Sequence, residues 1–134
     1  MNDVTERNKE KVRFFVEAVW NEGRIELIDE LVADDYVGHV PCLDGGVLGT
    51  GGMRRLVSSR RRALAGLHVK IEDQVAEDDL VVTRWHATTA PPGVGDRGAV
   101  GGSTPCCAGI SIVRLLAGKQ VDCHTEYTNL VARA

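Results

Sequence analysis

The apolar residues of this chain change their spacing near Leu67, from the repeat of a helix to the alternation of a strand. Before that point an apolar stripe recurs at intervals of three and four residues and consists of Val12, Phe15, Val16, Val19 and Trp20. After it, Leu67, Val69 and Ile71 alternate with polar residues, which is the pattern of a half-buried strand. The order of helices and then strands predicts an α+β fold.

Turn and breaker residues divide the chain into expected elements. We expect helices over residues 5–21, 24–33 and 50–65, with Gly23 ending the first and an extended segment over 34–41 following the second. We expect strands from Leu67 to the turn at 77–79 and over 80–89, 106–116 and 119–132, paired as a four-stranded antiparallel meander. Residues 90–102, rich in glycine and proline, are expected to form a mobile loop at the rim of the sheet, a common place for a lid.

Composition narrows the class of protein. A length of 134 residues is that of one domain, which we take to span residues 1–134. The formal net charge of -3 gives no reason to expect nucleic acid as a partner. The N-terminal residues are polar and charged where a signal peptide needs an apolar core, and no apolar run reaches the length of a membrane span. We therefore expect a soluble, cytoplasmic protein.

The cysteines and the arginines of this chain could each suggest a binding site, but each group has a simpler structural interpretation. Cys42, Cys106, Cys107 and Cys123 lack the paired spacing of a zinc site, so we interpret them as small buried thiols in a reducing compartment and expect no metal. The helix over 50–65 carries five arginines, Arg54, Arg55, Arg60, Arg61 and Arg62. A solvent-facing side of that helix is favoured over a phosphate site.

Residues 109–126 have the pattern of a β-hairpin whose second strand places Asp122, His124 and Glu126 at alternate positions. Alternate residues share one face of a strand, so two carboxylates and an imidazole are expected to form one strip. Either this strip faces a cavity and does chemistry, or it faces water while Val121, Cys123 and Tyr127 are buried. The periodicity alone leaves both interpretations open.

Further candidates lie on the expected strand over 80–89. Arg84 and His86 share one of its faces, and Trp85 lies on the other. An arginine inside an apolar cavity is costly unless it pairs with an acid such as Asp122 or with a substrate oxygen. Each of these three residues is a candidate for lining a pocket, with ordinary packing as the alternative.

Five short motifs follow one another along the chain: V-W-N-E-G at 19–23, D-D-Y-V-G-H at 34–39, R-W at 84–85, G-I-S-I-V-R at 109–114 and G-K at 118–119. In this order they resemble the SnoaL-like polyketide cyclase family, within the nuclear transport factor 2-like superfamily. The resemblance implies a cone-shaped, strongly curved antiparallel sheet wrapped around the N-terminal helices, as in a cystatin-like α+β barrel. It also implies a deep pocket for a hydrophobic small molecule and a homodimer through the convex side of the sheet.

The resemblance also assigns roles, because a carboxylate in the pocket of relatives does acid/base chemistry without metal or cofactor. Asp122 is expected to accept and donate the proton, with His124 as its partner or as the donor to an oxyanion. His39, Arg84, Trp85, His86 and Glu126 are expected to bind substrate, His39 having a structural capping role as its alternative. The family's usual G-K-I-V-E-H-W is G-K-Q-V-D-C-H here, which marks either a reaction-specific pair or the loss of the usual pocket wall and of activity.

These expectations favour a small-molecule cyclase or isomerase that uses cofactor-free general acid/base catalysis in polyketide-type secondary metabolism. One alternative is an epoxide hydrolase or epoxide-opening cyclase, for which Arg84 with Asp122 is a partial match. Another is a non-catalytic dimeric module that binds a small ligand. Because aromatic residues make up only 4% of the chain, we expect an aliphatic cavity wall, which suits a hydrophobic, oxygenated molecule.

Overall fold

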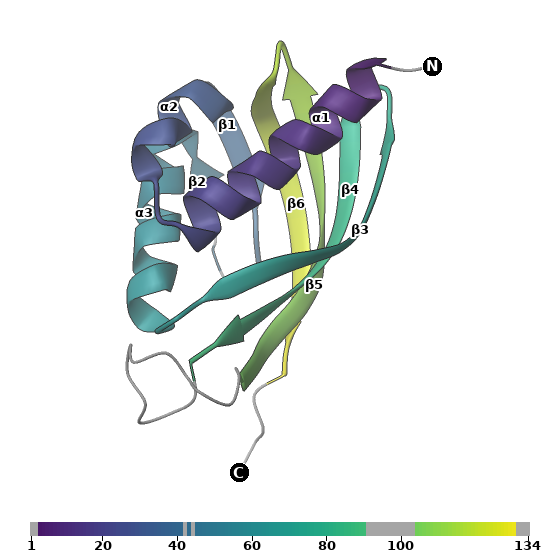
Figure 1. The fold of residues 1–134 in the computed structure, drawn as a ribbon. Coiled ribbons are helices and arrows are strands. Elements are labelled where there is room, and N and C mark those ends of the chain that lie inside the picture. Colours follow the sequence, from purple (N-terminus) through teal and green to yellow (C-terminus); the bar gives the residue numbers. More distant parts are fainter. Residues whose placement is uncertain (1–2, 42, 44, 91–103, 131–134) are drawn as a thin grey trace.

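The computed structural model describes residues 3–41, 43, 45–90 and 104–130. Helix α1 (Asp3–Phe14) continues into the π-helical segment η1 (Phe15–Asn21) and is followed by a short 3-10 turn η2 (Ile25–Leu27) and helix α2 (Ile28–Leu31). Strands β1 (Val32–His39) and β2 (Val47–Leu48) precede helix α3 (Gly49–Ala63). Strands β3 (His68–Glu77), β4 (Leu80–Thr89), β5 (Thr104–Leu116) and β6 (Lys119–Asn129) complete the fold. The helices pack against one side of a curved sheet, which is an α+β architecture (Figure 1).

The sheet has six strands in the order β2-β1-β6-β5-β4-β3. The antiparallel meander expected for β3 to β6 is confirmed by the register of all three hairpin pairs. The extended segment expected after the second helix is itself a strand, because β1 pairs with β6 in parallel and β2 pairs with β1 in antiparallel register. The sheet is therefore mixed rather than wholly antiparallel, and it is open, with β2 and β3 at its edges.

The first helical segment begins and ends close to the expected limits. Its apolar stripe buries Val12, Phe15 and Val19 against the sheet. Gly23, at φ 74°, takes the left-handed conformation that ends the helix, and its N–H donates to the carbonyl of Val19. The Asn21 side chain then accepts from the N–H of Val69 and donates to its carbonyl, at 2.7 and 2.9 Å. These two bonds fix the end of the helix against the first residues of β3.

The second expected helix is shorter than predicted. Helical structure ends at Leu31, and Val32, fully buried, is already the first residue of β1. The apolar residues of this region satisfy a helical repeat up to Leu31, but Val32 pairs with Gln120 of β6. Strand pairing therefore sets this boundary, whereas the expected helix over 50–65 is confirmed as α3.

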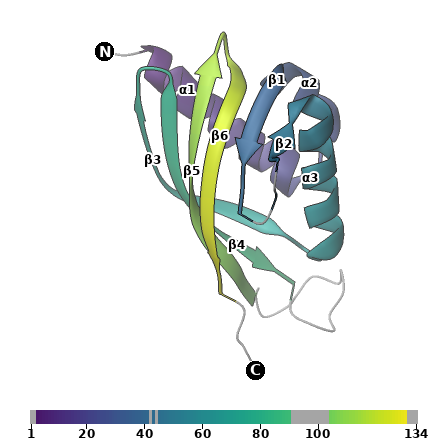
Figure 2. The ribbon, with the colours of Figure 1, turned by 180° about the vertical axis from the view of Figure 1, so that it is seen from behind.

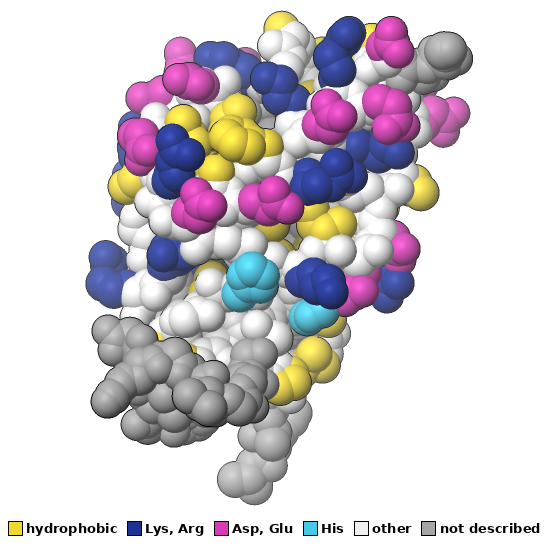
Figure 3. All heavy atoms as spheres, viewed as in Figure 1, with side chains coloured by type: hydrophobic (Ala, Val, Ile, Leu, Met, Phe, Trp, Pro, Cys, Tyr) yellow, Lys and Arg dark blue, Asp and Glu magenta, His cyan; other side chains and the backbone are white. Residues whose placement is uncertain are grey.

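The main hydrophobic core lies between the helices and the concave face of the sheet. Its fully buried side chains come from every layer: Val19, Ile28, Val32, Val57 and Val81. The rear view shows the opposite, convex face of β3 to β6 uncovered by any helix of the described chain (Figure 2). On the helical side, acidic and basic side chains are intermixed over the surface rather than segregated (Figure 3).

No helix in the described ranges is long and apolar enough to cross a membrane. Apart from Ala90, the loop expected over residues 90–102 lies outside the described residues.

Candidate functional site

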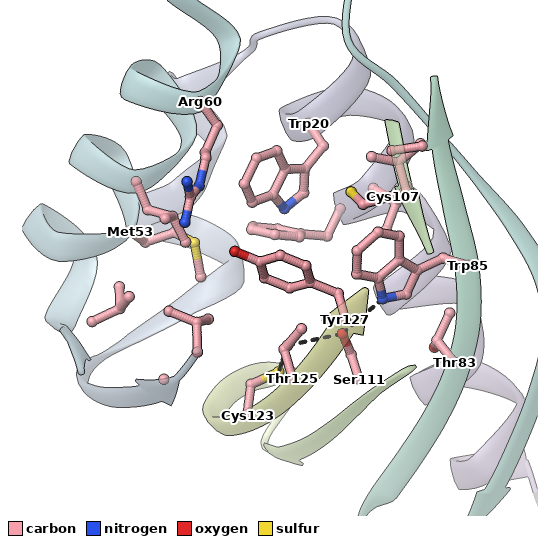
Figure 4. Close-up of a pocket in the computed structure, with 18 of the residues that line it drawn as sticks. Trp20, Met53, Arg60, Thr83, Trp85, Cys107, Ser111, Cys123, Thr125 and Tyr127 are labelled. Carbon is pink, nitrogen blue, oxygen red and sulfur yellow. Dashed lines mark hydrogen bonds between the residues drawn. The ribbon is translucent and has the colours of Figure 1, made fainter. Parts of the chain in front are cut away.

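A cavity of about 770 Å³ lies between the helices and the concave face of the sheet (Figure 4). This volume is within the range of small-molecule sites in proteins. Its walls are mainly apolar and come from α1 and η1, from α3 and from the inward-facing residues of the sheet. The lining includes Phe15, Trp20, Tyr36, Met53, Arg60, Trp85, Cys107, Ser111, Thr125 and Tyr127.

The face of β6 that lines this cavity consists of the odd-numbered residues Cys123, Thr125, Tyr127 and Asn129. A β-bulge sets this parity, because Arg114 pairs with Asp122 and Leu115 pairs with Gln120, which leaves Val121 as the extra residue. Gln120, before the bulge, also lines the cavity. Before the bulge the even-numbered residue of β6 therefore faces the cavity, and after it the odd-numbered residues do.

Asp122, His124 and Glu126 lie on the opposite, outer face of β6, and the expectation that they face the cavity is wrong. The side chains of His124 and Asp122 are 62% and 40% exposed, and His124 Nδ1 is 4.0 Å from Asp122 Oδ1. The alternation recognised in the sequence is real, but the strip faces outward. Catalysis by these groups would have to take place outside the cavity.

The other predicted site residues divide between the two faces. Arg84 donates from Nε to Asp73 at 2.8 Å, and Nδ1 of His86 is in close contact with the Glu72 carboxyl group, so both are held to β3 on the outer face. His39 borders the cavity, but it is exposed and its ring stacks on that of His124 with centroids 4.2 Å apart. Of the seven predicted site residues, Trp85 alone lines the cavity with a side chain that is held by a hydrogen bond to another cavity residue, Ser111.

A chain of hydrogen bonds crosses the cavity floor from β4 to β6. The indole N–H of Trp85 donates to Ser111 Oγ at 3.1 Å, and Ser111 Oγ lies 2.9 Å from Thr125 Oγ1. Thr125 Oγ1 is in turn 3.5 Å from Cys123 Sγ. Figure 4 shows these side chains along the lower wall of the cavity. Three adjacent strands are thus linked by side chains below the space that a ligand would occupy.

Burial raises the pKa of several cavity groups. It is the main cause of the raised pKa of Tyr36 and of Cys123, whose side chains also interact with each other. Burial, with the neighbouring Cys106 thiol, raises the pKa of Cys107 to about 12, while the charge of Arg60 acts in the opposite direction. These groups are therefore protonated at neutral pH and offer hydrogen-bond donors rather than bases.

Both adjacent cysteines line the cavity, although neighbours on a regular strand face opposite ways. The register explains this, since Cys107 pairs with Ala87 and Pro105 pairs with Thr88, so that Cys106 is the extra residue of a bulge. Cys106 and Cys123 are buried free thiols as expected, whereas Cys107 is only half-buried, and Cys42 lies outside the described residues. Within the described ranges, no cluster of three or more His, Cys, Asp or Glu side chains is arranged to hold a metal ion.

The profile of the SnoaL-like domain family matches residues 12–123, which is most of the chain. The chain belongs to the SnoaL-like domain family. The resemblance inferred from its motifs is thereby confirmed. No curated protein matches the chain at a significant level.

Solved structures place this SnoaL-like domain among proteins of the same fold. A candidate polyketide cyclase from Acidithiobacillus ferrooxidans is 24% identical with a TM-score of 0.75, and the match covers 90% of this chain and 87% of that one. A candidate SnoaL-like polyketide cyclase from Jannaschia is 16% identical with a TM-score of 0.76, covering 98% and 90%. An epoxide hydrolase of M. tuberculosis, described as LEH-like, is 17% identical with a TM-score of 0.68, covering 92% and 84%. At these identities the likeness is one of fold.

Sequence reasoning missed the aromatic character of this SnoaL-like cavity. The chain contains six aromatic residues, and all but Phe14 line the cavity: Phe15, Trp20, Tyr36, Trp85 and Tyr127. The expected aliphatic side chains do line the cavity, among them Val12, Leu56 and Val69, but the aromatic residues were not expected there, because low overall content says nothing about where the few of them gather. Trp85 of β4 and Tyr127 of β6 lie on either side of β5, both on the cavity face of the sheet, with ring centroids 6.5 Å apart.

Gly109 is required where Trp85 and Tyr127 approach each other. A Cβ at this position would lie 2.5 Å from the carbonyl oxygen of Glu126 and 2.7 Å from the Trp85 ring. We expect Gly109→Ala to lower the free energy of unfolding by about 1–3 kcal/mol, because the strand backbone, the Trp85 ring and the Tyr127 side chain must move. Urea denaturation followed by circular dichroism measures this. Gly51→Ala in α3 is the control: Arg55 Nη1, at 3.6 Å, is the nearest atom to its Cβ, so no loss is expected.

Proposed function

We propose that this SnoaL-like domain is a cyclase or isomerase that acts on a small, largely apolar, oxygen-bearing organic molecule bound in the cavity. The observation that carries the proposal is the cavity itself: about 770 Å³, walled by aromatic and aliphatic side chains, with a few hydrogen-bonding groups among them. Family membership supports the same class of reaction. Folding a flexible substrate against such walls brings its reacting ends together. The entropy lost in doing so is a large part of the free-energy barrier to ring closure, and binding in the cavity supplies it in advance.

The polar groups of the cavity favour a reaction assisted by hydrogen-bond donation. Among the described lining residues there is no aspartate or glutamate, so the proposal does not use a carboxylate base. Tyr127 and Arg60 are two donors that face the open space, where they can bind a negatively charged or polarised oxygen of the substrate. His39 borders the cavity, but its exposed ring stacks on His124 of the outer face, so the proposal gives it no part in proton transfer.

A non-catalytic ligand-binding module is the second candidate, and the missing carboxylate among the described lining residues is the observation that favours it. An epoxide hydrolase has less support, because Arg84 and Asp122 lie on the outer face rather than around a cavity water site. For either candidate we propose a homodimer through the convex face. The apolar side chains of Ile110 and Ile112 are 47% and 40% exposed there.

A cavity-filling variant tests ligand binding. The neutral fluorescent ketone Prodan is expected to bind one molecule per chain with a blue shift of its emission, because the cavity is apolar. Cys107→Phe extends a ring into the cavity and is expected to weaken this binding at least about tenfold while the protein remains folded, since loss of a few favourable contacts has that effect. Fluorescence titration measures both.

Asp122→Asn is the matched control and is expected to bind Prodan as the parent protein does, since Asp122 lies outside the cavity. Equal binding by the parent and Cys107→Phe would contradict the proposed site. Turnover separates the two candidates: acceleration of ring closure of acyclic poly-β-ketone esters supports the cyclase, and binding of those esters without acceleration supports the binding module.

A further inference from the structure

Arg60 occupies a position on α3 that the helical repeat assigns to the cavity. Met53, Leu56, Ala63 and Leu64 share this face, and all of them line the cavity together with Arg60. These residues are three or four positions apart, which is the spacing of an apolar stripe on a helix. Arg60 is the charged residue within this stripe. Of the five arginines interpreted as one solvent-facing group, this one alone is a cavity residue within the described chain. Figure 4 shows its guanidinium directed into the cavity beside Met53.

The Arg60 side chain has no hydrogen bond or ion pair with any described residue, whereas two of the four other arginines of α3 are engaged. Arg61 donates to the carbonyls of Trp20 and Asn21 at 2.7 and 2.9 Å, and Arg54 pairs with Asp29 at 2.8 Å. Because the described cavity lining contains no aspartate or glutamate, no acidic side chain there balances the Arg60 charge. A guanidinium facing an apolar space favours an anion, since its field is weakly screened there.

Tyr127 supplies a second donor on the same side of the cavity. Its hydroxyl is directed toward the region of Arg60 and Met53, and it makes no hydrogen bond with the described chain (Figure 4). A carboxylate has two oxygens and accepts several hydrogen bonds, of which an arginine supplies two in a planar arrangement. The phenol is then available to donate a further one. The apolar remainder of the ligand would lie against Phe15, Trp20 and Trp85.

We propose that the natural ligand of the cavity is an organic acid whose carboxylate binds to Arg60 and Tyr127. This inference deepens the proposed function and rests on it, because it names the substrate class of the same cavity. The acid group orients the molecule with one end at α3. The rest of the substrate is then held between the helices and the floor formed by Ser111 and Thr125.

A pair of probes of equal shape tests the proposal: 2-naphthoate, which carries a carboxylate, and 2-naphthamide, which is neutral. Calorimetric titration of the full chain at neutral pH is expected to show about tenfold tighter binding of naphthoate, the effect of charge-assisted hydrogen bonds. Arg60→Gln is expected to remove this preference and to leave naphthamide binding unchanged. Arg62→Gln, an equal charge change at an exposed position of α3, is the control and is expected to retain the preference.

Each outcome decides between the two proposals. Equal binding of the two probes by the parent protein overturns the organic-acid inference and leaves the cavity proposal standing, and so does a preference that persists in Arg60→Gln. Failure of both probes to bind overturns the proposed function and this inference with it. If Arg60→Gln does not fold, Arg60→Lys, which keeps the charge but loses the planar pair of donors, is expected to show a reduced preference. Tyr127→Phe is expected to reduce it by a smaller factor than Arg60→Gln.

Discussion

Replacing Ile28 with alanine is expected to lower the free energy of unfolding by about 2–5 kcal/mol, the range for removing a large aliphatic side chain from a packed core. Ile28 is the first residue of α2, and its side chain is 0% exposed. It belongs to the same core cluster as Val32 of β1 and Val57 of α3. The loss therefore leaves a cavity where helices and sheet meet. Urea denaturation monitored by circular dichroism measures the change.

Leu48→Ala is the matched control for this prediction. Leu48 belongs to the edge strand β2, and 59% of it is exposed, so its truncation is expected to cost no more than about 0.5 kcal/mol. Losses of similar size in the two variants would contradict the burial of Ile28. Because α2 is only one turn long, the result also shows how far the packing of α2 against β1 depends on this single side chain.

Alkaline pH is expected to destabilise the protein from about pH 9 upward, because burial raises the pKa of Tyr36, Cys107 and Cys123. In the unfolded chain these thiols and the phenol lose their protons near the ordinary pKa values of 9.0 and 10.0. The folded chain still holds those protons, so it binds more protons than the unfolded chain does. The stabilisation is complete below pH 9 and is lost as the pH rises toward the folded-state values.

Tyr36→Phe isolates the contribution of the phenol. For one buried phenol, the loss of stability between pH 9 and pH 11 is about 1.4 kcal/mol, because the unfolded chain ionises there and the folded chain does not. The pH-dependent loss in Tyr36→Phe is expected to be smaller by that amount, whatever its stability at neutral pH. Urea midpoints measured across pH 8 to 11 give the comparison. Parallel pH profiles for the two proteins would show that the phenol ionises freely in the folded state.

The arrangement of elements was predictable because hydrophobic spacing reports which residues are buried together. The change of period near Leu67 correctly separated the N-terminal helical region from the four-stranded meander. The β1 strand was harder to recognise, since its partner β6 lies more than eighty residues away in the sequence and the pairing leaves no local signal. The same long-range pairing ended the second helix at Leu31 rather than at residue 33.

The site was less predictable than the fold. Periodicity showed that Asp122, His124 and Glu126 share a face of β6, but it does not say which face is inside. The alternate set, with Cys123 and Thr125, is also partly polar, so the two faces differ little in hydrophobicity. Arg60 had a usable signal, because it falls in the apolar repeat of α3, but it was grouped with four neighbouring arginines by charge alone.

The bulge at Val121 decides which row of β6 side chains faces the cavity. If Val121 paired with Arg114 instead of bulging, every later residue of β6 would shift by one position, and the outer row would turn inward and bring two carboxylates and an imidazole into the aromatic cavity. An ancestral or descendant sequence could thereby exchange donor-assisted chemistry for acid–base chemistry without inventing a single new side chain. Comparing homologues for the presence of this bulge would therefore sort them by the kind of reaction that their cavities can support.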